Sequence, residues 1–172
     1  MGMDVIGKNA NSETGEYFRN NVWWWRPLWN YCEELHGDIV GSVEYGHSND
    51  GDGLDAREAY ALGLALEQDI ESGVTAEYER KYREQMASLP MNDCEYCGAT
   101  GIRTDEVGVK NGMPTKELEP EVAMLVGRTH GYCNGCRGEG KVDHFATNYG
   151  FSVENVRNFA EFLLECGGFE IW

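Results

Sequence analysis

The sequence predicts an α+β fold, a single compact domain with a helical hairpin, short strands and an inserted lobe that binds one zinc ion. Three observations lead to this prediction. Two Cys-x-x-Cys pairs occur, Cys94 with Cys97 and Cys133 with Cys136. Apolar residues recur at helical spacing in several segments bounded by capping residues and glycines. Short stretches of β-branched and aromatic residues lie beside those segments and favour strands.

The cysteine pairs are the most specific signal in the chain. Two residues between cysteines let a tight turn direct both sulfurs to one point, and two such turns supply the closed tetrahedral shell of a structural Zn²⁺. We therefore expect all four of these cysteines to be metal ligands. A disulfide, a redox-active pair and plain buried thiols are the alternatives. His130 and His144 lie close enough in sequence to replace a cysteine.

Glycines follow each pair, and backbone N–H groups there are expected to turn toward the sulfurs, which requires positive φ angles. The tails, with Gly101 after the first pair and Gly138 and Gly140 after the second, resemble the Cys-x-x-Cys-x-Gly-x-Gly repeats in the zinc-binding region of DnaJ-type co-chaperones. The second tail matches fully, whereas the first has Ala99 in place of a glycine. That region carries four repeats and two zinc ions, so two repeats imply one zinc. The His-Pro-Asp tripeptide of a J-domain is missing, so the resemblance implies a knuckle geometry and not chaperone function.

A weaker resemblance covers the whole chain. The segments Gly7–Asn9, Tyr17–Trp23, Asn49–Asp55 and Cys166–Phe169 are similar to those of small uncharacterised proteins of bacteria and their phages. This resemblance implies a bacterial or phage protein of the cytoplasm and adds no catalytic residue.

Charge limits the partners. The formal net charge is −16, so nucleic acid and anionic membranes should repel the chain, and a basic protein is the expected partner. No apolar run approaches the roughly 20 residues of a membrane span, and the first residues lack a signal-peptide pattern. We expect a cytoplasmic protein, because a reducing compartment favours metal binding by Cys-x-x-Cys pairs over disulfides.

Hydrophobic residues make up 41% of the 172 residues, which is enough for a sizeable core. Asp55 and Glu58 form a capping-box pattern at the start of a helix. The expected elements, in chain order, are a strand near residues 5–6, a helix at 27–35, a strand at 38–45, a helical hairpin of residues 55–71 and 76–88, a helix that begins after Ser152, and a closing strand at 169–172.

These elements divide the chain into three parts. Residues 1–90 are a Trp-rich, acidic α+β region, residues 91–142 are the four-cysteine lobe, and residues 143–172 supply a helix and a strand that complete the core. Cys32 and Cys166 fall outside the lobe and are interpreted as buried core thiols.

The tryptophans allow two interpretations. Trp23, Trp24, Trp25 and Trp29 lie within seven residues, and no regular element buries three consecutive rings on one face. They are either core residues packed from both sides, or they include an anchor for a partner protein, since Trp is enriched in binding hot spots.

The loop His47–Asp55 alternates acids and glycines like a calcium loop, but Ala59 stands where an EF-hand needs its bidentate Glu, which favours a polar turn. From Glu33 to Glu71 the chain has eleven acidic residues and a single basic one, Arg57. These acids either keep the protein soluble or imitate the phosphates of a nucleic acid.

The main functional hypothesis is a zinc-stabilised, acidic protein-interaction protein, in one form a nucleic-acid mimic that inhibits a basic host protein. No phosphate-binding loop, nucleophile elbow or His-Glu-x-x-His pair occurs. The alternatives are an enzyme with a site near His36, His47, Asp50 and Asp52, and a regulatory adaptor that binds through the Trp-rich segment. A cleft that joins these histidines and acids would favour the enzyme.

Overall fold

The computed structural model describes residues 2–172, and the chain forms two compact units. The main unit comprises residues 2–87 together with Asn148–Trp172, and the cysteine lobe comprises Ser88–Thr147. Within residues 2–172 there are seven α-helices and two small antiparallel sheets, which confirms the α+β class. The C-terminal helix and strand belong to the main unit, so the lobe is an insertion within it.

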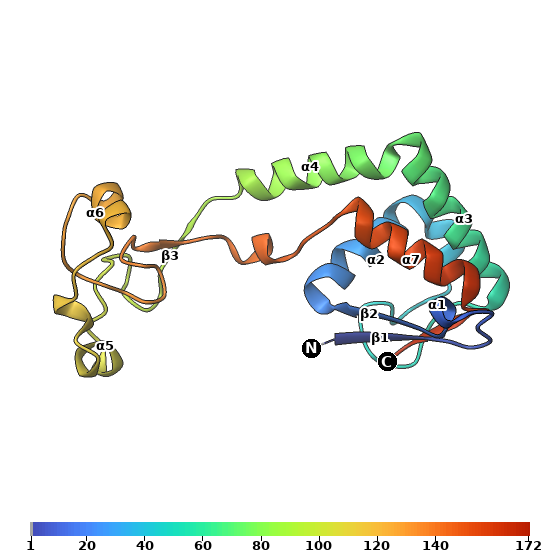
Figure 1. Ribbon diagram of the computed structural model, residues 1–172, viewed down its shortest axis with the longest axis horizontal. Coiled ribbons are helices and arrows are strands. Elements are labelled where there is room, and N and C mark those ends of the chain that lie inside the picture. The colour runs from blue at the N-terminus through green and yellow to red at the C-terminus, as the bar shows by residue number, and fades with distance from the viewer. Residues whose placement is uncertain (1) are drawn as a thin grey trace. The chain divides into compact units, whose positions relative to one another are not determined.

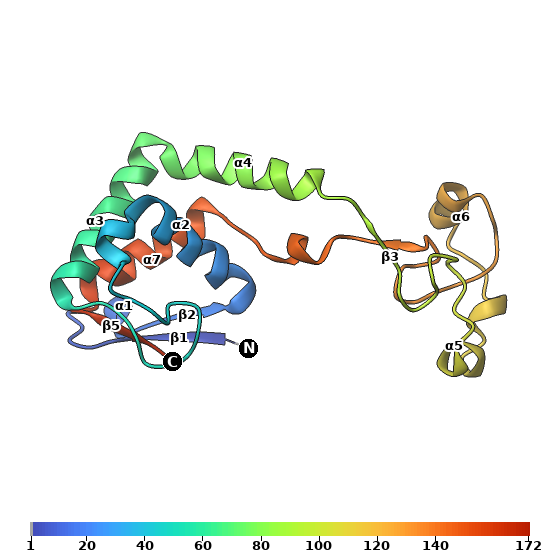
Figure 2. The ribbon, with the colours of Figure 1, turned by 180° about the vertical axis from the view of Figure 1, so that it is seen from behind.

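The main unit contains a three-stranded antiparallel sheet in the order β2-β1-β5 (Figure 2). Its strands are β1 (Gly2–Gly7), β2 (Tyr17–Asn21) and β5 (Phe169–Ile171). Val5 of the central strand pairs with Phe18 on one side and Ile171 on the other. The predicted strands near residues 5–6 and at the C-terminus are thus confirmed, and together they join the two ends of the sequence in one sheet.

The helices of the main unit lie on one side of this sheet, and not all of them contact it (Figure 1). They are α1 (Glu13–Glu16), α2 (Val22–Val40), α3 (Ala56–Ser72), α4 (Val74–Ser88) and α7 (Val153–Glu165). Helices α3 and α7 lie side by side. Gly63 of α3 permits this approach, because a Cβ there would lie only 3.0 Å from the side chain of Leu164.

The predicted start and end signals of α3 and the predicted start signal of α7 are confirmed. Asp55 and Glu58 form the capping box at the start of α3, and Gly73 ends it with φ of 83°. The side chain of Ser152 accepts the N–H of Asn155 at the start of α7. These local patterns specify the helix ends because they satisfy backbone groups that lack an intrahelical partner.

Helix α4 begins at Val74, two residues before the predicted start. Helices α3 and α4 point in different directions instead of packing side by side as in the predicted hairpin (Figure 1).

Helix α2 is longer than the predicted 27–35. It begins at Val22, because the Asn21 side chain accepts the N–H groups of Trp23 and Trp24 and caps the helix. Pro27 consequently lies inside the helix, where it cannot donate to the carbonyl of Trp23. That carbonyl instead accepts the N–H of Gly150 at 3.1 Å, so a tertiary hydrogen bond replaces the missing helical one.

The predicted strand at 38–45 is wrong. Helix α2 continues to Val40, and a turn follows in which the N–H of Val43 donates to the carbonyl of Val40. Both valines are buried in the core of the main unit. Their β-branched side chains suggested a strand, but packing against the helical core decided the backbone conformation.

The tryptophans supply much of that core. Trp25 and Trp29 are completely buried and stack with ring centroids 5.5 Å apart. Phe159 of α7 packs edge-on against Trp25, and Phe169 of β5 does the same against Trp29. By contrast, Trp24 is 39% exposed. The tryptophans of this one helix thus point in different directions, with Trp25 and Trp29 inside the core and Trp24 at the surface.

Cys32 and Cys166 are both buried in this core, as predicted. No helix among residues 2–172 combines the length and the apolar character that crossing a bilayer requires.

The cysteine lobe has little regular structure. Its elements are β3 (Asn92–Asp93), α5 (Glu106–Lys110), the 3₁₀ turn Met113–Thr115, α6 (Pro120–Val126), β4 (Lys141–Val142) and the 3₁₀ turn Phe145–Asn148, which begins at the end of the lobe. Strands β3 and β4 pair antiparallel, with Asn92 opposite Val142, where the chain enters and leaves the lobe.

Candidate metal centre

The structure brings the four cysteines of the two Cys-x-x-Cys pairs together in the lobe. The Sγ atoms of Cys94 and Cys133 lie 3.8 Å apart, and those of Cys97 and Cys136 lie 3.7 Å apart. All four sulfur atoms lie within 4.8 Å of one another, and the four residues are buried. Among residues 2–172 this is the one group of three or more Cys, His, Asp or Glu side chains arranged to hold a metal ion.

The spacing fits one central ion. Four thiolates at about 2.3 Å from a zinc ion stand about 3.8 Å from each other in a regular tetrahedron. The separations of these two pairs match that value, whereas a disulfide would require about 2.0 Å. The cluster therefore suggests a metal ion, and its ligand set is consistent with zinc.

Each Cys-x-x-Cys segment folds into the same turn. In the first, the carbonyl of Cys94 accepts the N–H groups of Cys97 and Ala99. In the second, the carbonyl of Cys133 accepts those of Cys136 and Gly138 in the same positions. Because the two turns repeat the same hydrogen bonds, each presents its two sulfurs in the same way, as the similar sequences predict.

The N–H groups of the glycine tails also turn toward the sulfurs, as expected. Gly101 donates to Sγ of Cys97 at 3.2 Å, and Gly140 donates to Sγ of Cys136 at 3.1 Å. Both glycines have positive φ, 71° and 78° respectively. Ala99, which departs from the glycine pattern, nevertheless adopts a φ of 64°.

Close packing adds a second requirement for glycine. A Cβ on Gly101 would lie 2.1 Å from the carbonyl oxygen of Gly138, and one on Gly140 would lie 2.3 Å from that of Ala99. Each tail thus packs against the backbone of the other. The N–H of Cys94 also donates to the carbonyl of Gly140 at 2.9 Å and joins the two turns.

Burial of the sulfur atoms opposes their ionisation. It raises the pKa of the Cys136 thiol to about 12 and also raises the pKa of Cys94. At Cys97 burial acts in the same direction, but the N–H of Gly101 and the neighbouring thiols outweigh it and lower the pKa. A divalent cation at the centre favours the thiolate form of its ligands, because its charge offsets the repulsion between them.

Arg103 lies outside the cysteine cluster and contacts both Cys-x-x-Cys turns. Its guanidinium donates to the side chain of Asn134 at 2.8 Å and lies 4.8 Å from the ring centre of Tyr96. Tyr96 belongs to the first turn and Asn134 to the second, so one side chain contacts both. The sequence contained no signal for this role, because Arg103 stands outside both motifs and its partners are distant in the chain.

The two histidines considered as replacement ligands lie outside the cluster. Nδ1 of His130 is hydrogen-bonded to Oγ1 of Thr129 at 2.8 Å. Nδ1 of His144 accepts the N–H of Ala146 at 3.1 Å. Four cysteines therefore complete the ligand set, and such a closed shell offers no open position for a substrate.

The histidines considered for catalysis have different partners in the main unit. Nε2 of His36 lies 2.8 Å from the carboxylate of Asp69, which also accepts the hydroxyl of Tyr31 at 2.7 Å. Nε2 of His47 lies 3.2 Å from the carboxylate of Glu33. The two histidines thus enter separate hydrogen-bond pairs.

The acids considered with them serve the polar turn. The Asp50 carboxylate accepts the hydroxyl of Ser48 two residues earlier. The Asp52 carboxylate accepts the N–H groups of Glu44, Tyr45 and Gly53, and although burial acts the other way, these bonds lower its pKa. These contacts are those of acids that organise a loop.

No protein-family model, curated protein or solved structure matches the chain.

Proposed function

We propose that this chain is an acidic protein-interaction protein, in which the main unit binds a basic partner protein and the cysteine lobe is stabilised by one structural Zn²⁺. The proposal includes a reducing cytoplasm, where thiols remain available to the metal. Its strongest support is the distribution of unpaired acidic side chains over the main unit.

The two units differ in charge. The main unit has twenty-one acidic and eight basic residues, a net charge of −13, whereas the lobe has nine and six, a net charge of −3. Within residues 2–172, the ion pairs with Lys or Arg involve only five acids of the main unit: Asp4, Glu77, Glu79, Glu84 and Glu170. Most of the acids of this unit are therefore not ion-paired with a Lys or Arg of the described chain.

The stretch from Glu33 to Glu71 is the clearest case. None of its eleven acids forms an ion pair with a Lys or Arg of the described chain, and eight of them are exposed. Uncompensated carboxylates on a folded surface attract a complementary basic surface and speed its association. The nucleic-acid mimic is the form of this proposal in which the partner's own ligand is DNA or RNA.

Zinc is the ion proposed for the lobe because four thiolates around one centre are typical of structural zinc sites. The same ligands leave no exchangeable position, which supports a structural rather than a catalytic role. The lobe would then be a stably folded attachment to the acidic unit, and the metal would contribute folding free energy to it.

The test begins with affinity purification from the native host, followed by binding kinetics of the recovered partner at increasing salt. Asp38, Glu67 and Glu71 are suitable for neutralisation, because they are exposed and no hydrogen bond or ion pair involves their side chains in the described chain. The triple variant Asp38→Asn, Glu67→Gln and Glu71→Gln should associate about tenfold more slowly at low salt, with an effect that fades as salt rises.

The matched control removes the same charge from the lobe by changing Glu117, Glu119 and Glu121 to glutamine, and it should alter association less than about twofold. DNA or RNA should displace the partner if the acids act as a phosphate mimic. A partner that is acidic, or one whose binding is indifferent to salt, would contradict the proposal. Asp52 and Asp55 are unsuitable targets, because they hold the turn and cap α3.

A further inference from the structure

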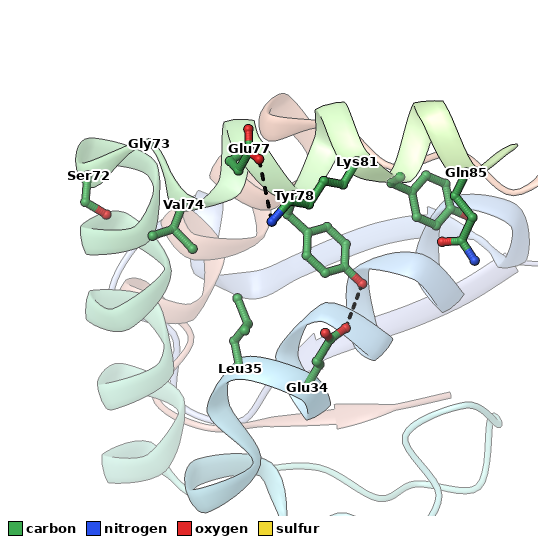
Figure 3. A pocket seen from close by; sticks show the side chains of 10 residues that line it. Glu34, Leu35, Ser72, Gly73, Val74, Glu77, Tyr78, Lys81 and Gln85 are labelled. Atoms are coloured by element: carbon green, nitrogen blue, oxygen red, sulfur yellow. Dashed lines mark hydrogen bonds and ion pairs between the residues drawn. The ribbon is translucent and has the colours of Figure 1, made fainter. Parts of the chain in front are cut away.

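A groove of about 600 Å³ opens in the main unit between the C-terminal half of α2 and helix α4 (Figure 3). Helix α4 buries only one residue, Thr75. It is held to the core through Tyr78, whose ring lies 4.8 Å from that of Tyr31 and 4.8 Å from that of Phe151. This attachment leaves room between the two helices beside Tyr78.

The floor of the groove is apolar. Leu35 of α2 and Val74 of α4 line it and are 41% and 42% exposed. Leu28 and Cys32, on the same face of α2, are completely buried, but Leu35 lies directly before the break in helical geometry at His36. Two exposed aliphatic side chains in a concave site favour the burial of an apolar group from another molecule.

Acidic groups stand on both sides of this floor. Glu77 of α4 is ion-paired with Arg80 at 2.7 Å and with Lys81 at 3.5 Å, so its charge is already compensated. Glu34 of α2, by contrast, accepts the hydroxyl of Tyr78 at 3.1 Å (Figure 3). Burial is the main cause, and the hydrogen bond to Glu34 the second, of a pKa of Tyr78 raised to about 12. The Tyr78 hydroxyl therefore remains protonated and a donor at neutral pH. Glu34 has no Lys or Arg partner within residues 2–172 and can accept a cation from outside.

We propose that the groove between α2 and α4 binds a basic amphipathic helix of the partner protein, with an apolar side chain over Leu35 and Val74 and a Lys or Arg paired with Glu34. Charge complementarity selects this occupant: a helix with an acidic polar face would meet Glu34, which has no Lys or Arg partner among the described residues, and a purely basic segment would leave the apolar floor uncovered. Helix-in-groove recognition of this kind uses apolar anchors at helical spacing. The inference rests on the proposed function and names the place where the partner is anchored.

The test uses the full-length protein and three synthetic helical peptides that differ in one property each. The first contains Leu on one face and Lys on the other, the second has Ser in place of Leu, and the third has Glu in place of Lys. Methyl NMR and calorimetry should show that the first peptide binds and shifts the methyl signals of Leu35 and Val74. The Ser and Glu peptides should bind at least about tenfold more weakly.

Matched variants separate the groove from the general surface. Leu35→Ser should weaken binding of the Leu/Lys peptide about tenfold, and Val74→Ser should have a similar effect. Leu64→Ser is the control, because Leu64 is 48% exposed on α3 and does not line the groove. Glu34→Gln should weaken binding about threefold at low salt, whereas the control Glu67→Gln should leave it within about twofold. The melting temperature of each variant shows whether it has kept its fold.

The outcomes distinguish this inference from the proposed function. Equal binding of the Ser and Leu peptides, unchanged affinity in Leu35→Ser and Val74→Ser, or shifts confined to the cysteine lobe would overturn the groove, even while the natural partner still binds with salt sensitivity. Absence of binding by the Leu/Lys peptide would overturn it as well. Loss of salt-sensitive binding to the natural partner would instead overturn the proposed function.

Discussion

The main unit and the cysteine lobe each have a different kind of interior. The core of the main unit contains fully buried aromatic rings, among them Trp25, Trp29 and Phe159. The buried cluster of the lobe consists of its four cysteines, with Val142 partly buried against them. Helix α6 of the lobe buries no residue at all, and its Met124 is 84% exposed.

The difference shows how two kinds of sequence can specify a fold. The main unit buries enough apolar surface to order its chain, which is the usual requirement for a domain. The lobe has little apolar surface inside, so its stability depends on ligands converging on one point, as in small metal-stabilised domains. The first two of the following predictions separate these two modes, and the other two test what the lobe's turns require.

The largest effect is expected from loss of a cysteine ligand. Purified protein should contain one zinc ion per chain, and Cys133→Ser should remove it, because structural zinc contributes on the order of 10 kcal/mol to folding in small finger peptides. The lobe should unfold while the main unit keeps its melting transition, as observed by elemental analysis and NMR. Cys166→Ala, in the core of the other unit, should keep the metal. Native protein without stoichiometric metal, in which all four thiols react freely, would contradict this prediction.

The converse change removes a ring from the main core. Trp29→Ala should destabilise the main unit by about 3–5 kcal/mol, because it leaves a cavity beside the stacked Trp25. The lobe should retain its metal under conditions in which the main unit unfolds. Trp24→Ala, at a half-exposed position, should cost clearly less in a denaturant titration. Simultaneous loss of the metal and of the main unit would show that the two units do not fold independently.

A glycine of the second tail provides a smaller effect within the lobe. Gly140→Ala should destabilise the lobe by more than about 2 kcal/mol, because it combines a left-handed backbone with a clash against the carbonyl oxygen of Ala99. Gly127→Ala is the matched control: its φ is 69°, but no atom lies within 4 Å of the added Cβ. That control should cost about 1–2 kcal/mol. The rate at which a chelator removes the metal compares the stability of the lobe in the two variants. Equal rates for Gly140→Ala and Gly127→Ala would show that the clash is unimportant.

The smallest effect is expected at the departure from the glycine pattern. Ala99 has a φ of 64°, so Ala99→Gly should relieve strain and stabilise the lobe by up to about 1 kcal/mol. Ala123→Gly, inside α6, should act in the opposite direction by about 1 kcal/mol, because glycine is unfavourable in a helix. Calorimetric melting of the lobe shows whether each variant is stabilised or destabilised. A destabilised Ala99→Gly variant would contradict the proposed strain.

Much of this architecture was predictable from local sequence. The capping box at Asp55, the cap at Ser152 and the terminal strand at Phe169 follow from residues that satisfy nearby backbone groups or pair in a sheet edge. The cysteine cluster was predictable for a similar reason, since two residues between ligands determine the turn that presents them. In both cases the information lies within a few positions of the residue it determines.

Other features were decided only by tertiary structure. Residues 38–40 continue a helix and not the predicted strand, because Val40 is buried in the helical core. Pro27 has no N–H to donate to the carbonyl of Trp23, but it is tolerated inside α2 because the N–H of Gly150, far along the chain, donates to that carbonyl instead. The groove beside Leu35 likewise depends on how α4 attaches through Tyr78. The helix and strand propensities of a residue differ by only a small free energy. Where burial or hydrogen bonds between distant segments conflict with these propensities, the tertiary contacts therefore decide the backbone conformation.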